Sequence, residues 1–337
     1  MKKDIHRVIS TFGDRALIEL DNKIVPCLIR TKKQRIVTND FVGINKDTKP
    51  ILITSRVERK NLFFRQNNEK KKLIAANLDN LYLIIASKPR FSSETLISML
   101  ASALKENISV SIVLNKIDLK KETEKIKETL GFISPFKIQS RDSSSNFYLE
   151  PSIIDGLNSK IVFCSTKFTN GITELKESIK IYDDEKLVST VAFAGQSGTG
   201  KSSIINLIIP DAKIKISSIS KSLNTGKHTT TSSKNYKILD KINKKVWVID
   251  TPGIEKFGIS HLTLNDIKRV FPEWEKINSK FGNCKFSNCI HNLEPGCQIK
   301  KLLNDLSNSH QMQLDYINLK TRLKIWLNLL SMINSKD

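Results

Sequence analysis

The stretch Gly195–Ser202, GQSGTGKS, follows the apolar run VAFA at 191–194 and opens the run KSSIINLII at 201–209. It matches the pattern G-x-x-x-x-G-K-[ST], in which backbone N–H groups and a helix N-terminus surround phosphate oxygens. An ordinary glycine-rich turn is the alternative for the motif alone. A strand before the motif and a helix after it are what a phosphate-binding loop requires, so the context favours that interpretation.

The side chains at the end of this loop predict its chemistry. We expect Lys201 to reach the β- and γ-phosphates and the Ser202 hydroxyl to ligate Mg²⁺. The residues predicted to contact the nucleotide phosphates are Gly195, Gln196, Ser197, Gly198, Thr199, Gly200, Lys201, Ser202 and Ser203.

A second motif, Asp250-Thr-Pro-Gly253, follows the apolar run KVWVI at 245–249. The pattern D-x-x-G is a common turn when it stands alone. Downstream of a phosphate-binding loop, it places Asp250 at the second Mg²⁺ position, through a water molecule, and the N–H of Gly253 near the γ-phosphate.

A third motif, Asn115-Lys-Ile-Asp118, follows SVSIVL at 109–114. The carboxylate of Asp118 can accept two hydrogen bonds from the N1–H and amino groups of guanine, and adenine does not offer this edge. A site built on such bonds rejects the wrong base, because its buried carboxylate would stay unpaired. We expect Asn115 to tie the loop to its neighbours and the stem of Lys116 to cover the base.

A weaker signal, Ser165-Thr-Lys, follows the run KIVFC at 160–164, and a backbone N–H of Ser165 could bond the guanine carbonyl. Each of the four motifs stands just after an apolar run, where open α/β sheets bind their ligands. Apolar runs that alternate with helical stretches predict an α/β domain with a mostly parallel sheet.

The five cysteines divide into two kinds. Cys27 and Cys164 stand alone in apolar runs and are expected in the core, whereas the pattern Cys284-x4-Cys289-x-His291-x5-Cys297 clusters three thiols with an imidazole. Three thiolates and one histidine make a closed tetrahedral set that is typical of structural zinc, with unrelated loop thiols as the alternative.

The net charge is +21, and basic residues gather at Arg56, Arg59, Lys60 and Arg65 and again at Lys70–Lys72. Such an excess favours a polyanionic partner, although a compositional drift toward lysine also raises it. The longest apolar stretches, such as Leu81–Ala86, are far shorter than the ~20 residues of a membrane helix. We therefore expect a cytoplasmic protein with no membrane contact, and clustered thiols in a reducing compartment.

The first seventy residues contain short β-branched runs broken by Gly, Asn, Asp and Pro, which predicts a small antiparallel barrel or sandwich. The polar run QNNEKKK at 66–72 is expected to be a junction between domains. Beyond about residue 279 the Cys/His cluster precedes a largely helical tail.

The order of the motifs is unusual, because NKID and STK precede the phosphate-binding loop. In this order the chain resembles the circularly permuted GTPases and, among them, the ribosome small-subunit-dependent GTPase A family. The segments that carry the resemblance are AANLDNLYLIIASKP, IVLNKIDL, GQSGTGKSSIIN, GKHTTT, DTPGIEKFG and the Cys-His cluster.

The resemblance implies a multidomain fold: an all-β OB-fold barrel at 1–70 that binds RNA, a circularly permuted α/β P-loop GTPase domain at 73–278, and a mostly α zinc-binding domain at 279–337. An SH3-like barrel stays open as an alternative. The family also implies a monomer that binds GTP, the 30S ribosomal subunit and 16S rRNA, that assists late maturation of the subunit, and whose GTP hydrolysis the subunit stimulates. The zinc ligands of the family match Cys284, Cys289, His291 and Cys297.

Within GKHTTT at 226–231, the resemblance makes Thr230 the best Mg²⁺ ligand in the GTP state, although the register among the three threonines is open. His228 could orient the attacking water or touch RNA, and a solvated histidine is the alternative. Ile254 follows DTPG where Ras-like enzymes have a water-orienting Gln, so intrinsic hydrolysis is expected to be slow. Two other functions stay open: a GTP switch for another RNA client, such as an RNA-modifying enzyme, and an RNA-binding module with a vestigial nucleotide site.

Overall fold

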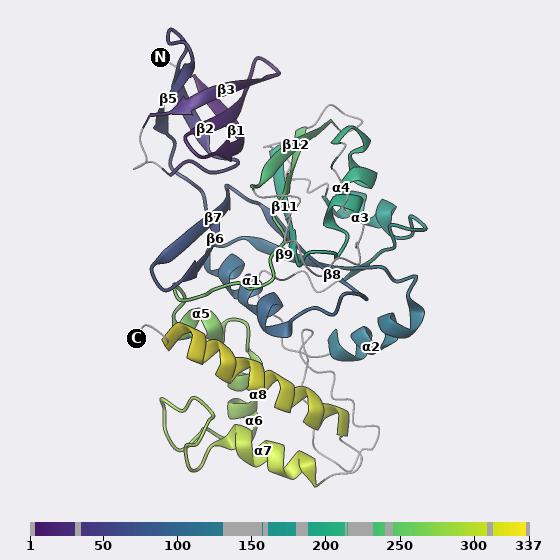
Figure 1. The fold of residues 1–337 in the computed structure, drawn as a ribbon. Helices are drawn as coiled ribbons and strands as arrows, with labels where there is room; N and C mark the ends of the chain where they lie inside the picture. The colour runs from purple at the N-terminus through teal and green to yellow at the C-terminus, as the bar shows by residue number, and fades with distance from the viewer. Residues whose placement is uncertain are drawn as a thin grey trace, which may run out of the picture.

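The structure is a computed structural model, and it describes residues 4–30, 35–130, 157, 161–179, 188–212, 214, 232–239, 245–308 and 313–334. Three parts follow one another from one end of the molecule to the other (Figure 1). A barrel holds the N-terminus, a mixed sheet with helices lies in the middle, and a group of helices holds the C-terminus.

The N-terminal barrel has five strands, and the strand β4 pairs back with β1 to close it. Its strands are β1 (Ile5–Phe12), β2 (Arg15–Leu20), β3 (Lys23–Ile29), β4 (Phe41–Asn45) and β5 (Ile51–Arg56). The order is β1-β2-β3-β5-β4, and β3 pairs with β5 in parallel, so the barrel is not wholly antiparallel as the sequence suggested. This closed five-stranded arrangement is that of an OB fold, so the SH3-like alternative is excluded.

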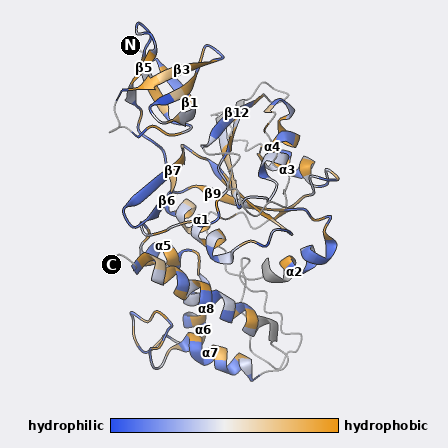
Figure 2. Ribbon diagram, viewed as in Figure 1, coloured by the Kyte–Doolittle hydropathy of each residue, from blue (hydrophilic) through white to orange (hydrophobic). Residues whose placement is uncertain are grey.

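The polar run at 66–72 forms the turn end of a β-hairpin, and its place as a junction between domains stays a prediction. Strands β6 (Leu62–Asn67) and β7 (Lys70–Ala76) pair antiparallel around a tight turn at Asn68, whose φ is 47°. Asparagine tolerates that left-handed conformation, and Phe63 and Ile74 bury the far end of the hairpin. Figure 2 shows how hydrophilic the exposed end is. The domain boundary predicted between 70 and 73 falls inside β7, and the domain limits stay predictions.

The central sheet has the order β10-β9-β8-β11-β13-β12, and β12 alone among these six runs antiparallel, at the edge next to the barrel. The strands are β8 (Asn80–Ala86), β9 (Ser109–Asn115), β10 (Val162–Phe163), β11 (Val188–Gly195), β12 (Lys234–Leu239) and β13 (Lys245–Asp250). One pair, Ser10 with Lys234, joins β1 of the barrel to β12.

Helices cover both faces of this sheet, as expected for a parallel sheet. Alternate residues of β8 show why: Leu81, Leu83 and Ile85 pack in one core cluster, whereas Tyr82 and Ile84 pack in the other. The first cluster includes helix α1 (Ser93–Lys105), and the second includes α3 (Ile172–Ile179) and α4 (Lys201–Ile208). Helix α2 (Lys120–Leu130) follows the NKID motif, and a short 3-10 turn (Pro210–Ala212) follows α4.

The C-terminal helices are not separate from the central core. They are α5 (Leu264–Lys268), α6 (Glu273–Phe281), α7 (Gln298–Ser307) and α8 (Gln313–Asn334). Trp326 and Leu329 of α8 belong to the same core cluster as α1. Helix α6 spans the boundary predicted between 278 and 279, and the fully buried Arg322 of α8 forms an ion pair with Glu273 of α6 at 2.6 Å.

Candidate functional site

The phosphate-binding motif forms the turn between β11 and α4, at the carboxyl end of the parallel strands. Gly198 and Gly200 have φ of 80° and 89°, which glycine adopts without strain. A Cβ on Gly195 would lie 2.2 Å from the carbonyl oxygen of Ile84, and one on Gly200 would lie 2.3 Å from Nδ2 of Asn115. A residue with a side chain would therefore not fit at either position, where the loop packs on β8 and on the NKID motif.

Lys201 at the end of this loop and Asp250 after β13 are both buried, and their charges interact. Burial lowers the pKa of the Lys201 ammonium, and the nearby Asp250 charge opposes that shift. Burial raises the pKa of Asp250 to about 6, and Lys201 again opposes the shift. Oδ1 of Asp250 is buried with no hydrogen-bond partner among the described residues. An acidic oxygen left without a partner beside a phosphate-binding loop fits a hydrated Mg²⁺.

The DTPG turn lies directly against the phosphate-binding loop. The Thr251 hydroxyl donates to the carbonyl of Phe193 in β11 at 2.8 Å. The N–H of Ile254 donates to the carbonyl of Gly195 at 3.0 Å. A Cβ on Gly253 would lie 3.2 Å from Cβ of Ser197, so this turn and the loop are in close contact.

The NKID motif binds the other side of the same loop. Nδ2 of Asn115 donates to the carbonyl of Thr199 at 2.9 Å, which confirms that this side chain ties the loop to its neighbours. Nζ of Lys116 donates to the carbonyls of Gly198 at 2.6 Å and Lys88 at 2.7 Å, so its stem lies across the loop. Burial lowers the pKa of Lys116.

Ser165 lies beside Asp118 through its side chain. The Ser165 hydroxyl donates to Oδ1 of Asp118 at 2.6 Å, and the N–H of Thr166 donates to Oδ1 of Asn115 at 3.3 Å. The sequence indicated only a backbone contact for Ser165, and no local pattern pairs these two side chains. Lys88 was also missed as a loop contact, although it belongs to the segment ASKP that carries part of the family resemblance.

The structure thus brings the predicted residues of four motifs to one edge of the sheet. Gln196 closes the loop by accepting a bond of 2.9 Å from the Thr199 hydroxyl, and Ser202 and Ser203 lie in the first turn of α4. His228 and Thr230 lie outside the described residues, so their roles stay predictions.

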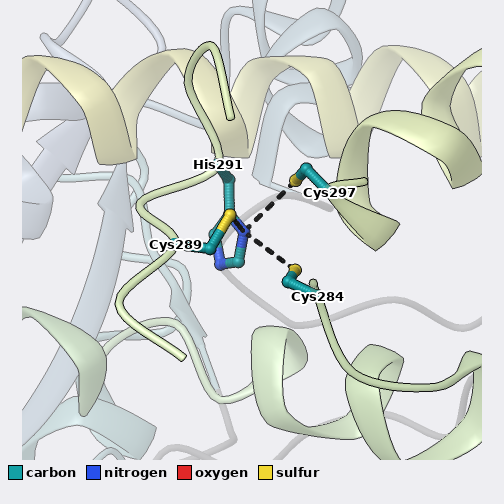
Figure 3. A group of neighbouring side chains, drawn as sticks. All are labelled: Cys284, Cys289, His291 and Cys297. Carbon is teal, nitrogen blue, oxygen red and sulfur yellow. Dashed lines mark hydrogen bonds between the residues drawn. The ribbon is translucent and has the colours of Figure 1, made fainter. Parts of the chain in front are cut away.

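The four predicted zinc ligands converge as a group, and their ligand atoms all lie within 4.8 Å of one another (Figure 3). Nδ1 of His291 is 3.5 Å from Sγ of Cys289 and of Cys297 and 3.7 Å from Sγ of Cys284. Tetrahedral zinc with the usual bond lengths separates sulfur from nitrogen by about 3.5 Å. The spacing and the donor set therefore both fit a zinc ion.

The backbone around these ligands is held by several contacts. The carboxylate of Glu294 accepts from the N–H of Ile290 and of Asn292, which shapes the turn that presents His291. The N–H of Gln298, at the start of α7, points to Sγ of Cys284 at 3.4 Å, as expected for a metal-bound thiolate. Nε1 of Trp326 donates to the carbonyl of Ile290 at 2.7 Å and joins α8 to the zinc loop.

The basic cluster near residue 60 divides into two groups with different surroundings. Arg59 is mostly buried and donates to Asp40 at 2.6 and 2.8 Å, and Lys60 pairs with Asp79 at 2.8 Å. Lys70 and Lys72, by contrast, are exposed on β7. Within the described parts of the chain, no helix is long and apolar enough to cross a membrane.

Comparison with known proteins gives consistent matches. The family model for the RsgA GTPase matches residues 56–260. The small ribosomal subunit biogenesis GTPase RsgA of Paraburkholderia xenovorans is 31% identical over 302 residues, which cover 88% of this chain and 86% of that protein. Its counterpart from Burkholderia pseudomallei K96243 is also 31% identical, over 89% of this chain and 86% of the relative.

Two solved structures share the fold over almost the whole chain. YjeQ from Thermotoga maritima aligns with a TM-score of 0.59 and 25% identity over 97% of this chain and 98% of its own. YloQ, a circularly permuted GTPase, aligns with a TM-score of 0.54 and 19% identity over 99% and 96%. This chain, whose phosphate-binding loop lies downstream of its NKID motif, belongs to the RsgA GTPase family.

Proposed function

We propose that this protein binds the small ribosomal subunit through 16S rRNA, assists a late step of its maturation, and hydrolyses GTP at a rate that the subunit stimulates. The observation on which the proposal rests is the convergence of Asp118, Lys201 and Asp250 at one sheet edge, in a chain whose relatives are named small ribosomal subunit biogenesis GTPases. We expect it to act as a cytoplasmic monomer.

Guanine selection follows from the surroundings of Asp118. Ser165 holds one carboxylate oxygen, and the remaining lone pairs are available for the N1–H and amino group of guanine. Lys116 spans the phosphate-binding loop beside this carboxylate, so its stem can cover the base. A base without those donors would leave the carboxylate unpaired. The free-energy penalty of that unpaired group is the larger part of the preference for guanine over other bases.

The phosphates are expected to occupy the turn between Gly195 and Ser202. Its glycines leave N–H groups free of side chains, and Lys201 adds a charge at the β- and γ-phosphates. Mg²⁺ bound with GTP would neutralise phosphate charge, and Ser202, Asp250 and Thr230 are the residues that would hold it. The Gly253 N–H is expected to bond the γ-phosphate from the DTPG turn.

Slow hydrolysis in isolation follows from Ile254. Its side chain is 3% exposed and packs in the core with Phe257, so it offers no polar group to an attacking water. The partner must therefore complete the water-orienting arrangement, with His228 as a candidate on this chain.

The charge distribution supports an RNA partner. The chain has a net charge of +21, and Lys70 and Lys72 on the exposed hairpin can pair with phosphates, because no acidic side chain among the described residues holds them in the way that Asp40 holds Arg59. The zinc group is expected to be structural, because its three thiolates and one imidazole leave no coordination position for a substrate.

The experiment that tests this proposal is GTP hydrolysis measured with and without purified 30S subunits. A large rise in turnover with 30S, absent with 50S subunits or with unrelated structured RNA, would support it. Stimulation by another RNA or RNA-modifying enzyme, and none by 30S, would favour a switch for a different client. Absence of GTP binding would reject the nucleotide function itself.

A further inference from the structure

The segment that follows the DTPG turn pairs with the edge of the β6–β7 hairpin. The N–H of Gln66 in β6 donates to the carbonyl of Gly258 at 3.0 Å, and the N–H of Ser260 donates to the carbonyl of Gln66 at 3.1 Å. Gln66 and Ile259 therefore form a parallel bridge. Residues 258–260 thus lie beside β6 in the place that a third strand of this sheet would take.

Side chains from both partners reinforce this pairing. The Ser260 hydroxyl donates to the carbonyls of Gln66 at 3.0 Å and of Asn68 at 3.2 Å, and Ser260 is buried. Nη1 of Arg65 donates to the carbonyl of Lys256 at 2.6 Å. A buried hydroxyl requires such acceptors, and the guanidinium adds a bond from a charged donor. The hairpin therefore holds both ends of the segment 256–260.

The middle of the segment packs closely on the same hairpin. A Cβ on Gly258 would overlap Oδ1 of Asn67 and lie 2.5 Å from the carbonyl oxygen of Gln66. The ring of Phe257 stacks on that of Phe63 in β6 with the centroids 5.3 Å apart, and both side chains are buried. A side chain at position 258 would therefore push the segment away from the hairpin.

The chain just before this segment lies in the nucleotide site. A Cβ on Gly253 would lie 3.2 Å from Cβ of Ser197, so the DTPG turn contacts the phosphate-binding loop. Only Ile254 and Glu255 separate Gly253 from Lys256, the first residue that the hairpin holds. Three residue steps span at most roughly 11 Å, so a displacement at Lys256 reaches Gly253 without a long loop to absorb it.

We propose that Arg65 and Gly258 are positioning residues for the γ-phosphate of GTP, because they hold residues 256–260 against β6 and thereby keep Gly253 against the phosphate-binding loop. The inference rests on the proposed GTPase function, in which the Gly253 N–H bonds the γ-phosphate. It gives the hairpin a second role, because the edge of β6 orients the nucleotide turn while the exposed end carries the lysines expected to meet RNA. GDP has no γ-phosphate, so its binding does not depend on this turn.

The test replaces Arg65 by Met, which keeps much of the side-chain length and removes the donor. In the full chain with Mg²⁺, titration calorimetry should show that Arg65→Met loses about fivefold in affinity for a non-hydrolysable GTP analogue, the effect of one lost hydrogen bond. The affinity for GDP should stay within about twofold of that of the parent protein. Arg65→Lys, which keeps a cationic donor at this position, should restore most of the affinity for the analogue.

Arg269→Met is the matched control. Nη1 of Arg269 donates to the carbonyl of Leu104 at 2.6 Å, so this variant also loses one positive charge and one guanidinium–carbonyl bond of the same length, but at α1 rather than at the hairpin. It should bind both nucleotides as the parent protein does. Equal losses of the two nucleotides in Arg65→Met, no recovery in Arg65→Lys, or the same analogue-specific loss in Arg269→Met would overturn the inference.

A second variant covers the case in which the first does not fold. Gly258→Ala crowds Gln66 and Asn67 but does not strain its own backbone, because the φ of Gly258 lies outside the left-handed region. It should weaken analogue binding by at least about fivefold and keep the affinity for GDP. Its control is Gly43→Ala, whose Cβ would lie 2.6 Å from Oγ of Ser55 between the paired barrel strands β4 and β5.

The outcomes of this second pair of variants also decide the inference. A selective loss of analogue binding in Gly258→Ala and none in Gly43→Ala would support it. An unchanged preference for the analogue in Gly258→Ala, or the same selective loss in Gly43→Ala, would overturn it. Failure of the unmodified protein to bind guanine nucleotides would instead reject the proposed function.

Discussion

The Ser165 hydroxyl donates a hydrogen bond of 2.6 Å to Oδ1 of Asp118, across 47 positions of the chain. Both residues lie just past the ends of neighbouring strands, Ser165 after β10 and Asp118 after β9. The hydroxyl holds the carboxylate in one orientation, which would prepare it for the guanine edge that the proposed function assigns to Asp118. Preorganisation of this kind gives both affinity and selectivity.

Asp118→Asn should change which base is bound. The amide replaces one acceptor by a donor, so it repels the 2-amino group of guanine and matches the carbonyl that xanthine has at the same position, while its oxygen still accepts from N1–H. We expect GTP affinity to fall at least about 100-fold and xanthosine triphosphate to bind more tightly than GTP. Ser165→Ala removes only the hydroxyl that orients the carboxylate, and it should lower the affinity for GTP by only about fivefold. Titration calorimetry with GTP, ATP and xanthosine triphosphate checks this, and equal binding of ATP and GTP by the unmodified protein would contradict it.

Much of this site was predictable from the sequence because each motif combines local geometry with chemistry. The phosphate-binding loop needs glycines at fixed spacing between a strand and a helix, and a single sequence shows that. The contact of Ser165 with Asp118 was not predictable, because it depends on the register of β10 against β9. The parallel pairing of β3 with β5 depends on how the barrel closes, which the pattern of a single strand does not show. The hairpin around Asn68 was also not predictable, because its sequence is polar and its strands depend on tertiary packing.

Asp250→Asn should stabilise the nucleotide-free, Mg²⁺-free protein as pH rises. Burial raises the pKa of Asp250 to about 6 from its ordinary value of 3.8, so between these two pH values the folded state holds a proton that the unfolded state has released. Stability therefore falls as pH rises from about 4 through about 6, and the amide removes this cost. We expect a gain of about 3 kcal/mol at about pH 8 that shrinks toward about pH 4, less the stabilisation that the Lys201 ammonium loses when the Asp250 charge is removed.

Urea unfolding across this pH range, with a chelator present, measures the effect. A variant that is less stable than the parent at high pH would show that Lys201 depends on the Asp250 charge more than burial penalises it. Mg²⁺-dependent GTP binding by the same variant should be weaker, so stability and activity should change in opposite directions.

Cys284→Ser and Cys297→Ser should each lose about one zinc ion per chain and unfold the region around α7 and α8 at a lower temperature. Metal binding stabilises this group because the ligands converge only in the folded state. Cys27→Ala, in the barrel core, is the control that changes a buried thiol and should keep the metal. Elemental analysis and thermal unfolding with and without chelator check the prediction. A zinc-free protein that chelator leaves equally stable would rule it out.

Charge reversal should separate RNA-binding lysines from structural arginines. The double variant Lys70→Glu, Lys72→Glu should weaken 30S binding and leave the stability of the protein unchanged. The slope of log affinity against log salt concentration should become shallower by the amount that corresponds to the loss of about 1–2 phosphate contacts. Arg59→Glu should instead destabilise the barrel by about 3 kcal/mol, because it leaves the fully buried Asp40 beside another anion. Binding titrations at several salt concentrations and thermal unfolding distinguish the two. If the lysine pair leaves both affinity and salt slope unchanged, the hairpin does not contact rRNA.

Gly253→Ala should uncouple nucleotide state from subunit binding. The chain runs from Gly253 through Ile254 and Phe257, which belong to the same core cluster as Trp326 of α8, so the γ-phosphate turn and the C-terminal helices share one packed interior. We expect the intact protein to bind 30S more tightly with a non-hydrolysable GTP analogue than with GDP, since a ligand shifts an equilibrium only by its differential affinity.

Removal of residues beyond 278 would cut α6 and expose that interior, so a point substitution is the better test. An alanine Cβ would lie 3.2 Å from Cβ of Ser197, so the turn and the phosphate-binding loop would have to move apart by a few tenths of an ångström. The variant should keep its affinity for GDP, because the turn is expected to contact only the γ-phosphate. Its 30S affinity with the analogue bound should fall toward the 30S affinity with GDP bound. Retention of the full preference in Gly253→Ala would show that the signal to the C-terminal helices does not pass through this turn.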